Sequence, residues 1–110
     1  ALVDAADCLS DSPPSFRRFP LPFESAELDA DERVVQDLRA AMLETGIDDT
    51  EPRGATYGAD SRHYVAAGIP TVLFGPGTIE QAHFPDETIR WEDVEQAQET
   101  IAETARRFLA

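Results

Sequence analysis

Lysine is absent from this chain, and cysteine occurs only once. Nine arginines therefore carry all of the positive side-chain charge at neutral pH, against 22 aspartates and glutamates, and the formal net charge is −13. A surface this acidic repels nucleic acid and anionic lipid, so we expect neither a nucleic acid nor a membrane as a partner. The single cysteine, Cys8, cannot form a disulfide within the chain, which fits a cytoplasmic protein.

Long apolar runs are also missing. No stretch reaches the length that a bilayer span needs, and the first residues do not resemble a signal peptide. The 110 residues are enough for one modest domain. The chain starts at Ala1 without an initiating methionine and runs directly into a helix-compatible segment, so we expect it to be a piece of a longer protein.

Two longer helices are predicted from apolar residues that recur at helical spacing. The first is expected from an N-cap at Asp31 to about Glu44, with Gly46 supplying a left-handed residue after its end. The second is expected from about Glu92 to Leu109, with two arginines in its last turn, where the helix dipole favours positive charge.

Strands are predicted between these helices. Residues 54–58 are small and strand-capable, and residues 70–74 form a continuous apolar run that suits a strand buried on both faces. A short helix over 61–67, capped by Asp60 and ended by Gly68, is expected between them. This alternation of strand and helix predicts an α/β fold.

The segment after the second strand carries the chemistry. Its Gly-Pro-Gly turn at 75–77 lets the backbone approach a ligand closely and present amide groups to an anion. His83 follows in a loop and could bind a metal through one nitrogen, while a neighbouring carboxylate fixes the proton on the other. From the residues alone, plainer interpretations stay open: a structural histidine, a simple turn, a solvated Arg62 and an N-cap at Asp60.

Three blocks in this region resemble one family in their order and spacing. They read YGADSR at 57–62, GIPTVLFGPG at 68–77 and QAHFPDE at 81–87. The family is that of the co-catalytic metallohydrolases, which includes acetylornithine deacetylase, succinyl-diaminopimelate desuccinylase, aminoacylase and glutamate carboxypeptidase. The stretch from the glycine turn to the end of the third block looks closest to the acetylornithine deacetylase branch.

The resemblance implies a fold in two parts. Residues 23–110 would be the C-terminal segment of a three-layer α/β/α zinc-peptidase-like catalytic domain, and residues 1–22 the end of a small α+β lid or dimerisation domain. A possible short strand over 15–19, and the prolines that follow it, agree with a domain boundary near Phe23.

The resemblance also implies roles for particular residues. His83 matches the family's final metal ligand in a site for two divalent ions, zinc or cobalt, and Arg62 matches an arginine that helps to hold the substrate carboxylate. His63 is interpreted as structural. Gly75 and Gly77 would bind substrate with Arg62 as part of the pocket lining, and Asp60, Asp86 and Glu87 would support the site.

The family's other ligands and its catalytic base, which lie on a His-x-Asp strand end and a Glu-Glu pair, do not occur in this chain. We therefore expect part of a two-metal amidohydrolase that cleaves N-acyl amino acids to a free amino acid and a carboxylate, with no activity in this chain alone. Its partners would be the N-acyl amino acid, the rest of the catalytic domain and, through the lid, a second subunit.

Two alternatives stay open. Within the family, the protein could be a metallo-dipeptidase, a carboxypeptidase or a desuccinylase, because most of the acyl pocket comes from sequence outside this chain. In a different class, it could be a non-catalytic acidic interaction domain that keeps the family-like core only for folding.

The composition predicts a stability that depends on salt. Lysine-free, acid-rich surfaces resemble those of halophilic proteins, and repulsion among the excess carboxylates destabilises the compact state until salt screens it. Molar sodium chloride should therefore raise the melting temperature, measured by circular dichroism. A melting temperature that does not respond to salt would remove the halophilic interpretation.

Overall fold

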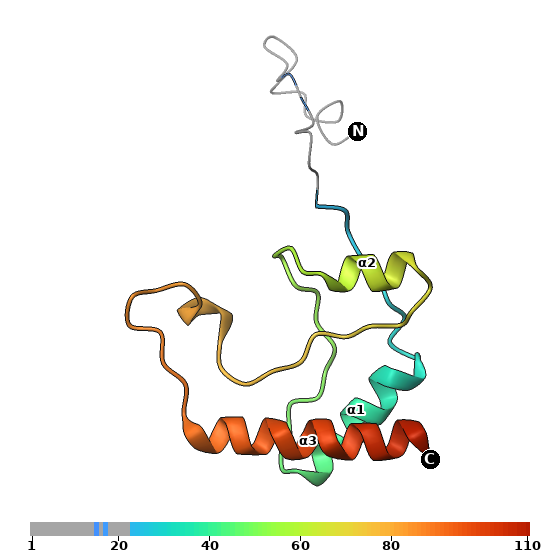
Figure 1. Ribbon diagram of the computed structural model, residues 1–110, viewed down its shortest axis with the longest axis vertical. Helices are drawn as coiled ribbons and strands as arrows, with labels where there is room; N and C mark the ends of the chain where they lie inside the picture. The colour runs from blue at the N-terminus through green and yellow to red at the C-terminus, as the bar shows by residue number, and fades with distance from the viewer. Residues whose placement is uncertain (1–14, 16, 18–22) are drawn as a thin grey trace.

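The computed structural model of the chain describes residues 15, 17 and 23–110. Its elements are the helices α1 (Arg33–Glu44), α2 (Ser61–Ala66) and α3 (Trp91–Leu109) and a 3-10 turn, η2 (Ile79–Gln81) (Figure 1). The predictions for the lid segment 1–22, including its strand and the thiol of Cys8, lie outside the described residues apart from Ser15 and Arg17. Within the described part, no helix is long and apolar enough to cross a membrane.

Helices α1 and α3 pack against each other and form the core of the described part. α1 buries Val35, Leu38 and Ala41, which lie three residues apart on one face, and α3 buries Ala97 and Thr100. Because alanine and threonine are small, the two helices can approach closely at this interface. Figure 1 shows α1 crossing behind α3, with α2 and η2 joined to the pair by long loops.

The predicted glycine ends of the helices are confirmed. After α1, the Gly46 N–H donates to the Leu43 carbonyl (3.2 Å), and the Ile47 N–H donates to the Met42 carbonyl (2.8 Å). This pair of bonds requires a left-handed residue, and Gly46 has φ 84°. Gly68, with φ 77°, ends α2 in the same way.

The helix starts differ from the prediction. α1 begins after Glu32 rather than Asp31, and the Glu32 side chain makes no capping hydrogen bond. The Asp31 N–H instead donates to Asp29 Oδ1 (2.9 Å), so Asp29 closes the turn before the helix. Asp60 does precede α2, but its side chain makes no capping bond and its backbone is already helical (φ −70°, ψ −13°).

The predicted strands at 54–58 and 70–74 are not strands in the described part of the chain. Neither segment makes a backbone–backbone hydrogen bond with another described residue. A strand needs a neighbour that exchanges ladder hydrogen bonds with it, and an apolar run predicts burial without providing that neighbour. The second segment is accordingly not enclosed, and its Leu73 is 49% exposed. The described residues are therefore helical rather than α/β.

A buried polar contact joins the end of α1 to the middle of α3. The hydroxyl oxygens of Thr45 and Thr100 are 2.6 Å apart, and Thr100 is 0% exposed. Each hydroxyl also reaches a carbonyl of its own helix, Ala41 for Thr45 (3.0 Å) and Gln96 for Thr100 (2.8 Å). The Gln96 side-chain amide donates to the Thr45 carbonyl (2.8 Å). The buried hydroxyls are thus satisfied within the helix pair.

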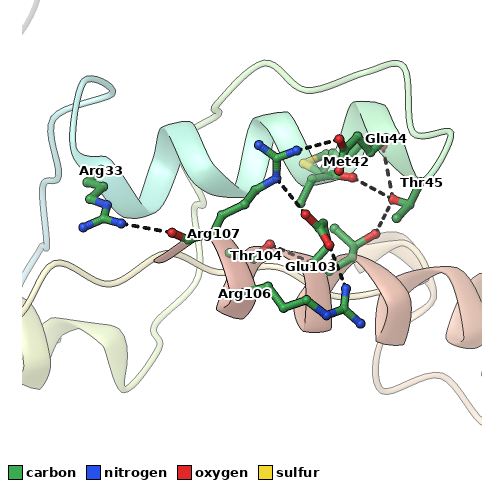
Figure 2. A network of polar contacts seen from close by, with 10 residues as sticks. Arg33, Met42, Glu44, Thr45, Glu103, Thr104, Arg106 and Arg107 are labelled. Atoms are coloured by element: carbon green, nitrogen blue, oxygen red, sulfur yellow. Dashed lines mark hydrogen bonds and ion pairs between the residues drawn. The ribbon is translucent and has the colours of Figure 1, made fainter. Parts of the chain in front are cut away.

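An ion-pair network lies along the same interface (Figure 2). Arg107 of α3 reaches Glu44 of α1 (Nη2 to Oε1, 2.7 Å) and Glu103 one turn back along α3 (Nε to Oε1, 3.1 Å). The hydrogen bond and the charge of Arg107 hold the pKa of Glu44 below its ordinary value. Arg33 donates to the Arg107 carbonyl (3.0 Å), so the start of α1 satisfies a free carbonyl in the last turn of α3.

The threonine pair predicts a specific loss of stability. Thr100→Val keeps the shape of the side chain but removes the hydroxyl, and we expect it to lower the free energy of unfolding by about 1–3 kcal/mol. Urea denaturation measures this loss. Thr104→Val is the matched control, because the Thr104 hydroxyl donates only to the Thr100 carbonyl of its own helix (2.7 Å). Equal losses in the two variants would show that the contact between helices contributes nothing.

The Glu44–Arg107 ion pair predicts a pH dependence. A carboxylate with a depressed folded-state pKa stabilises fully above its unfolded-state pKa, about 4.3 for glutamate. That stabilisation is lost as the pH falls through the lower folded-state pKa of Glu44. Glu44→Gln should therefore lower the free energy of unfolding at pH 7 and have a smaller effect at pH 3.

The control for this pH series is Glu99→Gln. Glu99 is exposed on α3 and forms no ion pair within the described residues, so its removal should change stability little at either pH. Denaturation curves for both variants at both pH values give the comparison. A loss in Glu44→Gln that is the same at pH 3 and pH 7 would contradict the assignment.

Candidate functional site

The short helix α2 carries Arg62, the residue expected to hold the substrate carboxylate. Its Nη1 donates to the Ala59 carbonyl (3.1 Å), and its guanidinium carbon lies 4.6 Å from the centre of the Phe23 ring. The side chain is half-buried. One contact in the plane of the guanidinium and one over its face together favour a single orientation.

Arg62 differs from its neighbours because it has no carboxylate partner among the described residues. Every other arginine from position 33 onward forms an ion pair. The pairs are Arg33 with Asp37, Arg39 with Glu51, Arg53 with Asp49, Arg90 with Glu92, Arg106 with Glu103 and Arg107 with Glu44. In a chain with 22 acidic residues, this one guanidinium remains available for a carboxylate from outside the described part.

His83, the expected metal ligand, lies in the loop between η2 and α3. Its φ of 68° falls in the left-handed region that residues other than glycine seldom adopt. The His83 N–H donates to Glu87 Oε2 (3.0 Å), and the Glu87 N–H donates to the Phe84 carbonyl (3.1 Å), which closes the turn. Among the described residues, Glu87 therefore contacts the backbone of His83, and His83 is exposed.

Two neighbouring hollows lie among α2, the loops and the helix pair. Arg62 lines the first, which has a volume of about 790 Å³. Gly75, Gly77 and Glu87 line the second, of about 950 Å³, and Gly77 has φ 90°, a conformation that favours glycine. Leu73 lines both hollows, so the hollow with Arg62 and the hollow with the glycine turn are neighbours.

The remaining expected positions lie outside these hollows. His83, Asp60 and Asp86 are exposed and line neither of them. The glycine turn and Glu87 thus line one hollow, Arg62 lines the neighbouring hollow, and His83 lies on a loop outside both.

A complete metal site is not formed by the described residues. They contain no group of three or more histidine, cysteine, aspartate or glutamate side chains that could hold a metal ion. A zinc site needs three or four protein ligands. His83, exposed and fixed through its backbone, fits the contribution of one ligand to a site whose other ligands lie elsewhere.

Phe23 is the residue of this region that the sequence did not predict. From the sequence, Phe23 marked only a domain boundary. Its contact with Arg62 joins residues far apart in the chain, and no local sequence pattern predicts such a contact. The nearest signal is Gly58. A Cβ there would lie 2.4 Å from Phe23 Cδ1, so the missing side chain makes room for the ring.

Comparison with known proteins gives one result. No curated protein and no solved structure matches the chain. A family model, described as Peptidase family M20/M25/M40, matches residues 16–107, and its span includes all three blocks on which the resemblance rested. Members of this family are hydrolases and are generally metal-dependent. With most of its length matched, the chain belongs to peptidase family M20/M25/M40.

Proposed function

We propose that this chain is the C-terminal part of a metal-dependent amidohydrolase that removes the acyl group from an N-acyl amino acid of the N-acetylornithine type. The observation that carries the proposal is the half-buried Arg62 guanidinium, which has no carboxylate partner in the described part of the chain. An N-acyl amino acid offers the α-carboxylate that such a cation binds. Membership of a hydrolase family supplies the reaction class.

Arg62 would orient the substrate rather than cleave it. A carboxylate held by the planar guanidinium fixes the position of the amide bond relative to α2. The glycine turn at 75–77 lines the neighbouring hollow, where the lack of side chains at both glycines would let a substrate approach the backbone. Arg62 would supply the carboxylate anchor, and the turn would supply an open backbone surface.

His83 would supply one ligand to a site for two divalent metal ions, zinc or cobalt. Its imidazole is a common ligand for both, and the turn closed by Glu87 holds the backbone from which it projects. A divalent metal at such a site provides Lewis-acid activation of the amide carbonyl and of water. The other ligands and the catalytic base would come from parts of the protein outside the described residues.

The uncovered apolar surface supports a larger catalytic domain around this chain. Trp91 is 69% exposed and Ile101 is 55% exposed, both on α3. Both are large apolar side chains that the described residues leave uncovered, and the run at 70–74 also lacks a strand partner in the described part. Both are satisfied if this chain completes a three-layer α/β/α domain with the rest of the protein.

The test compares the two histidines of the chain in the full-length protein. His83→Ala should lower bound zinc or cobalt, measured by atomic emission after metal loading and desalting, and should reduce turnover of N-acetyl-L-ornithine at least a hundredfold. His63→Ala is the matched control. His63 lies on the exposed side of α2 and was interpreted as structural, so both readouts should stay unchanged.

Each alternative gives its own result. If metal content and turnover are unchanged in His83→Ala, the metal-ligand assignment is wrong, and a wild-type protein without hydrolase activity indicates a non-catalytic domain. Assays with N-succinyl-diaminopimelate and a dipeptide separate the branches of the family. A higher kcat/KM for either than for N-acetyl-L-ornithine would contradict the deacetylase assignment and keep the hydrolase.

A further inference from the structure

The Phe23 ring lies against Arg62 of α2, with 4.6 Å between the ring centre and the guanidinium carbon. We propose that Phe23 is a positioning residue for substrate binding: its ring backs the Arg62 guanidinium and holds the N–H edge of that group ready for a carboxylate. This inference rests on the proposed function of Arg62 and adds to it the residue that sets its orientation.

The ring and a carboxylate use different parts of the guanidinium. An aromatic ring attracts the flat face of the cation, and the Phe23 ring centre lies 4.6 Å from the guanidinium carbon. A carboxylate accepts from N–H groups in the plane. Nη1 is bonded to the Ala59 carbonyl, whereas Nε and Nη2 donate to no described residue. The stack therefore leaves a two-nitrogen edge that can bind a carboxylate through both of its oxygens.

The Phe23 ring packs closely against Gly58. A Cβ added at Gly58 would lie 2.4 Å from Cδ1 and 2.8 Å from Cε1 of Phe23. The φ of Gly58 lies outside the left-handed region, so an alanine there would meet no backbone strain and would clash with the ring alone. Phe23 is otherwise 71% exposed, so the contacts with Gly58 and Arg62 are what place the ring.

The first hollow is a space beside Arg62 in which a ligand can lie. Arg62 and Gly58 line this hollow, whereas Phe23 is not among its lining residues. Arg39 and Arg53 also line the hollow, but each is already paired with a carboxylate. Among the arginines that line this hollow, Arg62 is therefore the one that can bind a substrate carboxylate without breaking an ion pair between described residues.

A second stack in the chain provides an internal control. Arg33 lies over the Phe108 ring, with 5.1 Å between its guanidinium carbon and the ring centre. Its Nε–Nη2 edge, the one that is free in Arg62, is occupied, because Nε donates to Asp37 Oδ2 (3.3 Å) and Nη2 donates to the Arg107 carbonyl (3.0 Å). Stacking without a free edge should give no carboxylate binding, so Arg33 should not respond to a ligand.

The experiment follows the arginine Nε–Hε signals of the 15N-labelled full-length protein during titration with N-acetyl-L-ornithine. The Arg62 signal, assigned by its loss in Arg62→Lys, should shift with the ligand, and the Arg33 signal should not. Phe23→Leu removes the ring current, so the Arg62 signal of the ligand-free protein should shift. The Kd for N-acetyl-L-ornithine should rise about two- to fivefold. Phe23→Tyr should restore both, and Phe108→Leu should leave the Kd unchanged.

Gly58→Ala tests the same contact without altering the ring. The added methyl should displace the Phe23 ring and raise the Kd for N-acetyl-L-ornithine as much as Phe23→Leu does. In the double variant Phe23→Leu/Gly58→Ala the clashing ring is gone, so the Kd should be the same as in Phe23→Leu alone. This variant also decides the matter if Phe23→Leu fails to fold.

The outcomes separate the two proposals. If the Arg62 signal titrates in the wild type and the Kd is unchanged in both Phe23→Leu and Gly58→Ala, the positioning role is overturned and the carboxylate site stands. If the Arg62 signal does not respond to N-acetyl-L-ornithine in the wild type, the carboxylate role of Arg62 fails, and the positioning role fails with it.

Discussion

The close approach of α1 and α3 is the contact on which the rest of the described structure depends. Small side chains at Ala41, Ala97 and Thr100 let the helices meet, and the hydroxyls of Thr45 and Thr100 then bond across the gap. A larger side chain at any of these buried positions would separate the helices and leave polar groups unpaired. Loops connect α2, which carries Arg62, to this pair of helices (Figure 1).

Positive charge is scarce in this chain, and most of the described arginines form ion pairs. Arg33 and Arg107 join the two main helices, and Arg39 and Arg53 fasten the loop that follows α1. Arginine suits this work because its planar fork binds a carboxylate or a carbonyl in a fixed geometry. Arg62 differs from these arginines, because it stacks on a ring and has no carboxylate partner among the described residues, and its proposed role in binding rests on that difference.

The sequence predicted the features that depend on nearby residues. Both long helices were placed within two residues, because apolar periodicity is a local property, and Gly46 and Gly68 were assigned correctly because only their left-handed backbone was needed. The strand at 70–74 was not found, since pairing needs a partner from elsewhere in the chain. The stack of Phe23 on Arg62 was missed for the same reason, while the positions of Arg62 and of the glycine turn came from the sequence blocks.

The backbone at His83 has a consequence for how this protein changes over generations. A left-handed φ of 68° is tolerated by glycine, asparagine, aspartate and histidine far better than by β-branched residues. Glycine would relieve the strain and asparagine would suit the turn, so substitution toward either should be favoured in any lineage in which the imidazole is not under selection. A histidine retained at this position among relatives would record continuing selection for its imidazole, against the preference of the local backbone.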